Sequence, residues 1–450
     1  MISCGPVSRA ALRLFLLFIS LAIAVGAAEA VFRVWYRDAG RRTLGGPGGR
    51  GFEHDTIDGE LRGRHDVGPR TPGVPRVMVI GDSITYGLGV RDWQQTWPEL
   101  LVRRLEAEGK RHELAVFATP GDDMPAHLKK MQEWADRVRP DVLIYQWYVN
   151  DIEAVSHRPD LTRAWQRAPW HRTLRNWSYL YFVADYRLSQ MLPAPGQSYV
   201  DYLLTDFAPG TLEWAEFERE FNEFAVRAML VSKRRLMVLY PQVPFRGDYP
   251  LQPINDRMRL LAGAHNLTIP PAAWTRSGGA MTPDAASPWK QVFAVPAKAP
   301  GGIIETADYA FPSGPLTIGL VVEKTGGEGG DEIARVQLID ADANSVIGDA
   351  PVRVARPAGT LCPVDLPFTL PGDGLRRVRV RVQSTGGGGW ALADIHAAVD
   401  YGFDVVDLAR PLNELQTHAS AFDAHPNEAA HRVMAEEIYK VLGAATATRQ

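Results

Sequence analysis

The stretch Val77-Met78-Val79-Ile80-Gly81-Asp82-Ser83 is a run of apolar, strand-forming residues that stops at a glycine and leads into a turn containing a serine. Four apolar residues in a row are typical of a parallel strand buried on both faces, and the helical pattern from Trp93 to Glu108 predicts a helix that covers it. Ser83 would then lie at the carboxyl end of the strand, where open α/β sheets bind ligands. The alternative is that Asp82 and Ser83 only cap the following helix.

A second stretch near the other end of the chain contains an acid and a histidine. Phe422-Asp423-Ala424-His425-Pro426-Asn427 directly precedes an amphipathic helical pattern from Ala429 to Leu442. A serine hydroxyl is a weak nucleophile unless a base takes its proton, and the base works best when a third group fixes its tautomer. Ser83, His425 and Asp423 are residues of the types that these roles require. The alternative is a structural histidine at a helix start, so the inference depends on pairing the two stretches.

These two stretches, with two others between them, resemble the SGNH or GDSL-type serine esterases. That family carries a serine in a Gly-Asp-Ser block near the start, and an acid and a histidine near the end. The intermediate matches are Gly121 in Ala118-Thr119-Pro120-Gly121 and Asn150 in Tyr148-Val149-Asn150-Asp151. All four blocks occur in the family's order, and the resemblance covers roughly 75–265 and 400–445.

The resemblance implies roles for particular residues. The implied catalytic residues are Ser83, Asp423 and His425, and the implied oxyanion hole consists of Ser83, Gly121 and Asn150. The chain departs from the family's pattern at two places. Tyr148 stands where the third block usually has glycine, and Asp423 lies two residues before His425, where three is the commoner spacing. Asp151 is the alternative candidate for the acid.

Length and composition limit the other possibilities. A chain of 450 residues is too long for one ordinary core, and a net charge of −3 gives no basic excess for a nucleic-acid partner. The two cysteines are far apart, with Cys4 in the N-terminal segment, so no structural disulfide is expected. Neither a His-Glu-x-x-His nor a Cys-x-x-Cys pattern occurs in the sequence, so no metal site is predicted. Gly87-Leu88-Gly89 lacks the third glycine of a dinucleotide turn, so we expect no cofactor.

Residues 1–37 are predicted to be a signal anchor or a signal peptide. Arg9 and Arg13 precede an uncharged apolar run, Leu14 to Ala28, that continues past Glu29. Ala28-Glu29-Ala30 would be the cleavage site of a signal peptide. We slightly favour the uncleaved anchor, because the apolar run up to Phe32 is nearly long enough to span a bilayer.

The positive residues precede the apolar run, so the rest of the chain is predicted to face the extracytoplasmic side, periplasmic or extracellular. Cleavage would instead give a secreted protein. Residues 38–74 are rich in Gly, Arg and Pro, and are predicted to be a linker.

From Arg76 onward, strand and helix patterns alternate, which favours an α/β fold with helices on both faces of a parallel sheet. The predicted strands are Arg76–Ile80, Glu113–Phe117, Asp141–Tyr148, Leu236–Tyr240 and Phe403–Leu408. We therefore expect a three-layer sandwich with a five-stranded parallel sheet, which the resemblance implies is flavodoxin-like. Its first part is 75–269, and 401–450 supplies the last strand and helix. Within it, 152–210 is an aromatic-rich helical excursion that either packs a small core of its own or forms a wall of the substrate pocket.

Residues 270–400 differ in character, with frequent Gly and Pro and short alternating runs. This pattern predicts an inserted antiparallel β-sandwich, because the α/β pattern resumes at Phe403. The insert resembles the jelly-roll modules that bind carbohydrate beside polysaccharide-modifying enzymes, an analogy at the level of the fold. Trp289 and Trp390 are either core residues or exposed platforms for sugar rings.

Together these features predict an exported serine esterase that cleaves ester groups, O-acetyl groups above all, from a carbohydrate or envelope polymer through an acyl-serine intermediate. The predicted partners are an acylated polysaccharide substrate and, through the N-terminal segment, a membrane. One alternative is a polysaccharide O-acetyltransferase that uses the same triad. Another is a non-catalytic carbohydrate-binding protein on an esterase fold.

Overall fold

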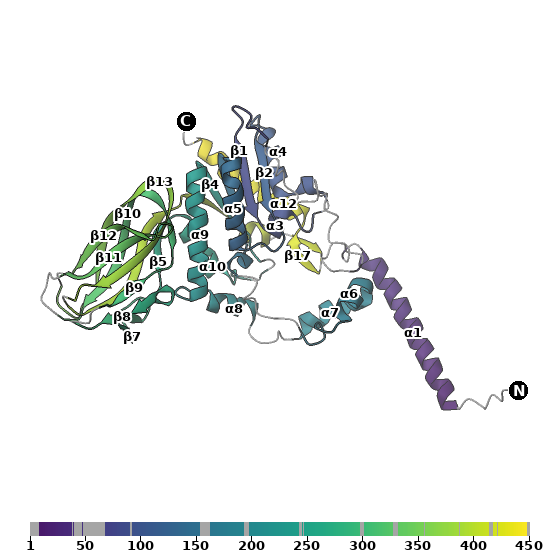
Figure 1. Ribbon diagram of the computed structural model, residues 1–450. Helices are drawn as coiled ribbons and strands as arrows, with labels where there is room; N and C mark the ends of the chain where they lie inside the picture. The colour runs from purple at the N-terminus through teal and green to yellow at the C-terminus, as the bar shows by residue number, and fades with distance from the viewer. Residues whose placement is uncertain are drawn as a thin grey trace.

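The computed structural model describes residues 9–37, 39, 47, 68–90, 92–153, 163–192, 198–242, 245, 247–297, 301–326, 332–354, 356–386, 388–413, 417–420 and 422–447. Most of the predicted linker, 38–74, lies outside these residues. An α/β unit occupies the centre of the molecule, with an antiparallel β unit on one side and the long helix α1 (Arg9–Trp35) projecting on the other (Figure 1).

The centre of the α/β unit is a five-stranded sheet in the order β15-β4-β3-β1-β2, with every pairing parallel. Val77 to Ile80 on β1 are completely buried, as expected for a strand covered on both faces. The five-stranded parallel sheet predicted from the sequence is therefore confirmed. Its strands are β1 (Arg76–Gly81), β2 (Glu113–Ala118), β3 (Val142–Trp147), β4 (Arg234–Leu239) and β15 (Phe403–Asp407).

Two helical layers cover the sheet, and alternate residues of β1 contribute to the two cores. Val77 and Val79 belong to one hydrophobic core, and Met78 and Ile80 belong to the other. The first core is closed by α4 (Trp97–Glu106), α11 (Ala409–Asn413) and α12 (Glu428–Ala447). The second is closed by α5 (Met124–Val138), α9 (Leu212–Val231) and α10 (Gln252–Ala262).

The second unit is an antiparallel β-sandwich, as predicted, whose main sheet runs in the order β12-β11-β13-β10-β14-β8-β7. Pairing begins earlier than the expected boundary at 270, because β5 (Ala264–Ile269) pairs with β14. Trp390 is completely buried in the sandwich core, so it offers no platform to a sugar. The remaining strands are β6 (Thr275–Ser277), β7 (Ala280–Pro283), β8 (Gln291–Val295), β9 (Ile303–Glu305), β10 (Tyr309–Lys324), β11 (Glu332–Asp340), β12 (Ser345–Arg353), β13 (Cys362–Ser384) and β14 (Trp390–Asp400).

Buried polar contacts hold the sandwich against helix α9. The completely buried Asn222 donates from Nδ2 to the Ala310 carbonyl at 2.9 Å and to the Tyr401 hydroxyl at 2.8 Å. Its Oδ1 accepts the Ala310 N–H at 2.8 Å. Beside it, Arg377 on β13 donates to Glu223 at 2.9 Å. The two units therefore share a specific interface.

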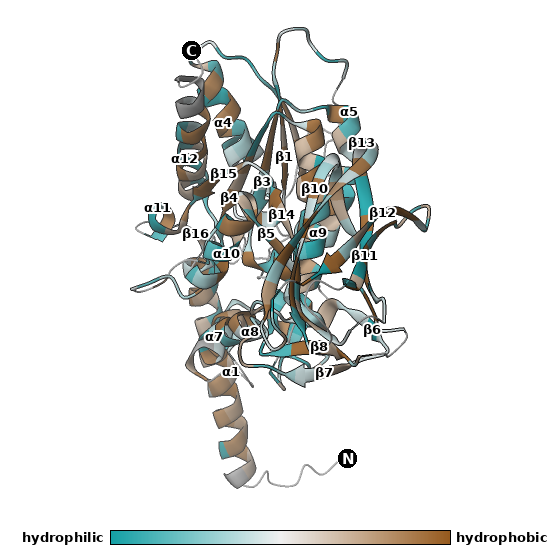
Figure 2. Ribbon diagram, turned by 90° about the vertical axis from the view of Figure 1, so that its left-hand side faces the viewer, coloured by the Kyte–Doolittle hydropathy of each residue, from teal (hydrophilic) through white to brown (hydrophobic). Residues whose placement is uncertain are grey.

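The segment after β3 forms helices α6 (His171–Trp177), α7 (Tyr179–Met191) and α8 (Tyr199–Asp206). Helices α6 and α7 lie beside the end of α1 that is nearer the α/β unit (Figure 1). Within α1, Ala11–Trp35 has the length and hydropathy of a membrane span or a signal sequence. Figure 2 shows that α1 is hydrophobic along most of its length.

Candidate active site

Ser83 begins the short helix α3 (Ser83–Tyr86) directly after β1, an interior strand of the parallel sheet. The turn is capped by Asp82, whose Oδ1 accepts the Ile84 N–H at 2.9 Å. Gln146 on the neighbouring strand β3 also fixes this turn, because its Oε1 accepts hydrogen bonds from the Thr85 hydroxyl at 2.8 Å and from the Thr85 N–H at 3.2 Å. Asp82 thus performs the capping role, and the Ser83 hydroxyl contacts another partner.

That partner is His425, which lies on β17 (Asp423–Pro426). The distance from His425 Nε2 to Ser83 Oγ is 3.1 Å, and the distance from His425 Nδ1 to Asp423 Oδ1 is 2.6 Å. In the neutral tautomer with the proton on Nδ1, the ring donates to Asp423, and Nε2 accepts the Ser83 hydroxyl proton. The fold therefore brings Ser83 together with Asp423 and His425, which lie 340 and 342 positions further along the chain, in an arrangement that can activate a serine.

The two-residue spacing between Asp423 and His425 has a simple structural cause. In an extended strand, side chains two residues apart point to the same side, so both side chains reach the same place. Asp423 Oδ1 also accepts the His425 backbone N–H at 3.0 Å, which fixes the carboxylate against its own strand. The alternative acid, Asp151, makes other contacts. It accepts the Tyr145 hydroxyl at 2.7 Å and lies 3.2 Å from His127 Nε2.

The segment that carries His425 is held in place on both sides. Asn427 Oδ1 accepts the N–H groups of Ala429 and Ala430 at 3.0 Å each, which caps helix α12. On the other side, Gly89 has a φ of +100°, and a Cβ at this position would lie 2.5 Å from the Pro426 carbonyl oxygen. Gly89 therefore allows the loop after α3 to approach the His425 segment closely.

The three candidate donors of an oxyanion hole come from adjacent strand ends. Because β1 lies between β3 and β2, the loops that follow these strands meet at one edge of the sheet. Gly121 occupies the turn after β2 with a φ of +87°, and Asn150 lies in the 3₁₀ turn η2 (Val149–Ile152) after β3. Asn150 Nδ2 reaches the Asp122 carbonyl at 3.5 Å, a long contact that joins the two loops. Among the described residues, the buried Asn150 Oδ1 has no hydrogen-bond partner.

Charged groups support this edge of the sheet. Lys130 forms an ion pair with Asp122 and donates to the Thr119 hydroxyl at 2.8 Å, which fixes the turn that contains Gly121. Complete burial, together with the charge of the neighbouring Asp151, raises the pKa of Asp82 to about 7. The carboxylate under the Ser83 turn is therefore costly to ionise.

Two supporting residues, Gln146 and Lys130, were not among the site residues predicted from the sequence. Gln146 could have been recognised as a lone amide at the end of an apolar strand pattern, because a buried polar group needs partners. Lys130 gave no comparable signal, since lysines on helices are usually exposed. Tyr148, which replaces the family's usual glycine, is partly buried, and its ring lies 5.8 Å from that of Tyr240.

Over the described part of the chain, no group of three or more His, Cys, Asp and Glu side chains is placed to hold a metal ion. Cys362 is a free, buried thiol, and Cys4 lies outside the described residues.

A serine at the end of an interior parallel strand, facing a histidine that contacts a carboxylate, is an arrangement typical of α/β serine hydrolases. Residues 79–288 match the model of the GDSL-like lipase/acylhydrolase family. This part of the chain is accordingly similar to the GDSL-like lipases and acylhydrolases, and it is an ester-hydrolysing serine hydrolase domain. The matched range contains Ser83, Gly121 and Asn150, and it ends before the segment that carries Asp423 and His425.

Solved structures resemble each of the two units at low sequence identity. The crystal structure of TesA has 17% identity and a TM-score of 0.26, covering 42% of this chain and 72% of that one. The C-terminal CBM6 of the laminarinase LamC from Zobellia galactanivorans has 14% identity and a TM-score of 0.24, covering 30% of this chain and 100% of that one. A family 35 carbohydrate binding module from Clostridium thermocellum has 12% identity and a TM-score of 0.24, covering 30% and 98%. These likenesses are too low to assign a ligand. The comparison with curated proteins found no match.

Proposed function

We propose that Ser83, His425 and Asp423 form the catalytic triad of an exported esterase that removes acyl groups, O-acetyl groups above all, from a carbohydrate or envelope polymer. The observation that carries this proposal is the pair of contacts at His425, 3.1 Å to the Ser83 hydroxyl and 2.6 Å to the Asp423 carboxylate. The imidazole therefore contacts the nucleophilic hydroxyl through Nε2 and the carboxylate that orients the ring through Nδ1.

The chemistry proceeds in two halves. Ser83 Oγ attacks the ester carbonyl as its proton passes to His425 Nε2, and Asp423 stabilises the imidazolium through Nδ1–H. The tetrahedral species collapses when the imidazolium gives its proton to the departing alkoxide, which leaves an acyl-serine. A water molecule then attacks the acyl carbon while Nε2 takes its proton, and collapse releases the carboxylic acid and restores the Ser83 hydroxyl.

The negative charge on the carbonyl oxygen requires donors at the same edge of the sheet. We assign this role to the backbone N–H groups of Ser83 and Gly121 and to the side-chain amide of Asn150. Donors fixed in place before the reaction stabilise the oxyanion more than the ground-state carbonyl. Asn150 Nδ2 lies 3.5 Å from the Asp122 carbonyl, a long contact that keeps the amide at this edge of the sheet and is weak enough for an oxyanion to replace.

An extracytoplasmic location is supported by helix α1, in which Arg9 and Arg13 precede an apolar stretch and which has the length of a membrane span. Retention of α1 gives a membrane-anchored enzyme, and cleavage gives a secreted one. Polymers that carry acyl groups on sugar hydroxyls are exposed on that side of the membrane, so they are the substrates we propose.

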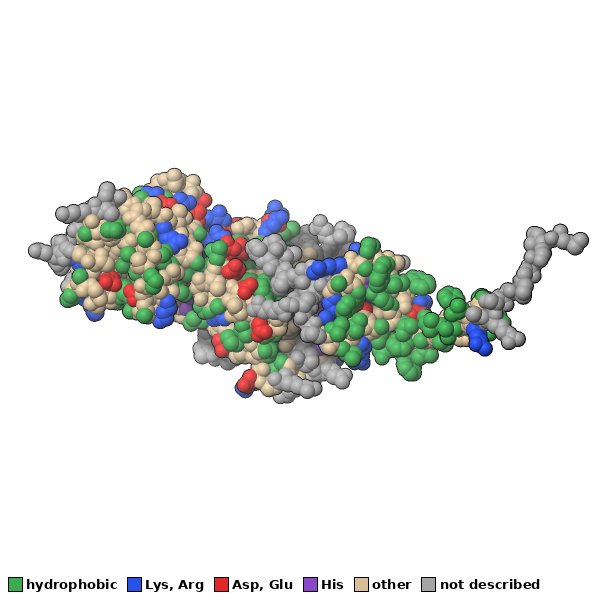
Figure 3. All heavy atoms as spheres, turned by 90° about the horizontal axis from the view of Figure 1, so that it is seen from below, with side chains coloured by type: hydrophobic (Ala, Val, Ile, Leu, Met, Phe, Trp, Pro, Cys, Tyr) green, Lys and Arg blue, Asp and Glu red, His purple; other side chains and the backbone are tan. Residues whose placement is uncertain are grey.

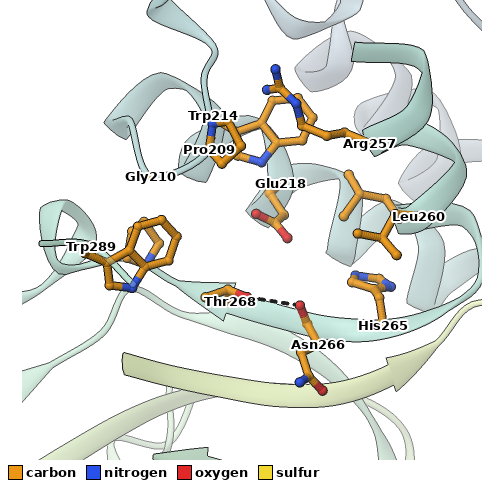
Figure 4. Close-up of a pocket in the computed structure, with 12 residues that line it drawn as sticks. Pro209, Gly210, Trp214, Glu218, Arg257, Leu260, His265, Asn266, Thr268 and Trp289 are labelled. Carbon is orange, nitrogen blue, oxygen red and sulfur yellow. Dashed lines mark hydrogen bonds between the residues drawn. The ribbon is translucent and has the colours of Figure 1, made fainter. Parts of the chain in front are cut away.

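A cavity between the two units supports a carbohydrate ligand. It has a volume of about 140 Å³ and lies between α9, α10, β5 and the Trp289 turn (Figure 4). Trp289 is held by an N–H donated to Asp394 at 3.0 Å, so one aromatic face is fixed at the cavity wall. Burial raises the pKa of Glu218 to about 8, so at neutral pH its protonated carboxyl can donate to a sugar oxygen. Aromatic faces with a few polar groups are common in ligand sites of this kind.

The test is to incubate the detergent-solubilised full-length protein with acetylated oligosaccharides and to measure products by mass spectrometry. We expect free acetate as the main product, lost in the Ser83→Ala variant. If the acetyl groups are found mainly on a second oligosaccharide, the reaction is acetyl transfer and not hydrolysis. Acetate release that is equal in the wild type and the Ser83→Ala variant would overturn the proposal. Trp289→Ala should weaken retention on the polymer and leave cleavage of a short ester unchanged.

A further inference from the structure

Helix α7 is attached to helix α1 by a charged side chain from within the apolar segment. The Glu29 carboxylate accepts the Ser178 hydroxyl at 2.8 Å and the N–H groups of Tyr179 and Leu180 at 3.1 and 2.9 Å. An anion at a helix N-terminus is favourable, because it satisfies N–H groups that lack partners within the helix. Arg33, one turn along α1, pairs with Glu29 at 3.1 Å. The N-terminus of α7 is therefore fixed at the end of the apolar helix.

Helices α6 and α7 both expose large apolar side chains. Trp170, Leu174 and Trp177 follow one face of α6, at the spacing that places side chains in a row along a helix. Trp177 is 73% exposed, and Met191 at the end of α7 is 80% exposed. Figure 3 shows hydrophobic side chains gathered in this part of the molecule and continuing onto α1. Contiguous apolar surface of this kind marks a contact site for a protein or a membrane.

The charge on these two helices favours a membrane. Among the described residues of α6 and α7, the exposed charged side chains are Arg172 and Arg187, both basic. The acid Asp185 is buried, where it accepts the Trp165 indole N–H at 2.9 Å. Tryptophans and arginines together suit the boundary between acyl chains and anionic headgroups.

We propose that the apolar side chains of α6 and α7 lie on the surface of the bilayer that α1 enters, so that the hydrolase domain is seated directly on the membrane. The inference rests on the proposed function, in which α1 is retained as an anchor. Continuity supports it, since the exposed face of α6 and α7 begins where Glu29 fixes α7 to α1.

Helix α7 and the residue that follows α1 contact the segment that carries the acid and the histidine of the candidate triad. Phe422 immediately precedes Asp423, and its ring packs edge-on against Phe182 and Tyr186 of α7, with centroid distances of 4.8 and 4.9 Å. It also meets Tyr36, just beyond α1, at 5.4 Å. The segment that orients His425 therefore rests on the same helices that would contact the lipid. This arrangement holds the site close to the membrane surface, where it would act on acyl groups of membrane-proximal polymer.

The experiment places full-length protein in nanodiscs of phosphatidylcholine and phosphatidylglycerol that contain doxyl-labelled lipid. In a Cys4→Ser, Cys362→Ala background, a fluorescent label is attached through Met191→Cys or Trp177→Cys. The matched control is Val346→Cys, which is 50% exposed on β12 of the sandwich. We expect the doxyl lipid to quench the label at 191 and at 177 severalfold more than the label at 346.

Equal quenching at the three positions would overturn the membrane seat. Stronger quenching at 346 than at 191 would also overturn it and would place the sandwich on the lipid. Cleavage of a short ester in detergent is measured on the same labelled proteins. Because positions 191, 177 and 346 are outside the triad, this activity reports on the proposed function alone, and the two proposals fail separately.

Discussion

The buried carboxyl of Asp82 offers a test of how the Ser83 turn is built. Asp82 is completely buried, and its Oδ2 has no hydrogen-bond partner among the described residues. Burial, with Asp151 nearby, raises the pKa of Asp82 from an ordinary 3.8 to about 7. Between these two values the folded state keeps the proton and the unfolded state has lost it. The free energy of unfolding must therefore fall as the pH rises through this window.

The size of the effect follows from the pKa difference of 3.2, which is 7 minus 3.8. At 1.36 kcal/mol for each pKa unit, ionised Asp82 lowers the free energy of unfolding by about 4 kcal/mol above pH 7. Asparagine cannot ionise, yet its Oδ1 can still accept the Ile84 N–H. An unpaired amide donor in place of Oδ2 costs about 1–3 kcal/mol at every pH, so the change with pH is the informative quantity.

The assay is chemical denaturation of wild type and Asp82→Asn in detergent at pH 4 and pH 8. We expect the unfolding free energy of Asp82→Asn, relative to that of the wild type, to be about 4 kcal/mol higher at pH 8 than at pH 4. Asp92→Asn is the matched control, because Asp92 caps the 3₁₀ helix η1 (Trp93–Gln95) in the same way from an exposed position. A difference for Asp82→Asn that stays constant from pH 4 to pH 8 would refute the reasoning.

Three further substitutions test other parts of the account. Asp423→Ala should lower turnover of a short ester by about 10⁴-fold, as loss of the orienting acid does in a known triad; a loss below about tenfold would move the role to another group. Asn150→Ala should lower kcat by about 10²–10³-fold with KM nearly unchanged, and unchanged turnover would remove Asn150 from the oxyanion hole. Asn222→Ala leaves the N–H and carbonyl of Ala310 buried without partners, so calorimetry should show a loss of about 1–3 kcal/mol for each group. An unchanged melting temperature for Asn222→Ala would contradict the specific interface between the two units.

Local pattern was sufficient to predict the sheet. The apolar run Val77 to Ile80 identified a strand buried on both faces, and the structure places it between β3 and β2 in the five-stranded parallel sheet. The β-sandwich could also be predicted from the sequence, because apolar and polar residues that alternate with a period of two indicate strands and not helices. The start of the sandwich was harder to predict. Strand β5 follows α10 directly after Gly263, and no change in composition separates it from the α/β pattern.

The parts that could not be predicted depend on contacts between distant segments. Glu29 looked like a charge at the edge of an apolar run, and nothing nearby in the sequence indicated that it would bind the N-terminus of α7, about 150 residues away. Asn222 looked like an ordinary polar residue on a long helix, but it joins α9 to β10. The geometry at His425 was predicted only as a pairing of residue types, because distances between such segments arise from the fold.

The most direct test of the central claim is covalent labelling of the full-length protein by an organophosphonate, which reacts with an activated serine. If His425 Nε2 activates the Ser83 hydroxyl across their 3.1 Å contact, the wild type should be labelled stoichiometrically at Ser83. The Ser83→Ala variant should carry no label at this or any other serine while it retains the melting temperature of the wild type. Full labelling of the Ser83→Ala variant, or an unlabelled wild type that is correctly folded, would contradict the triad.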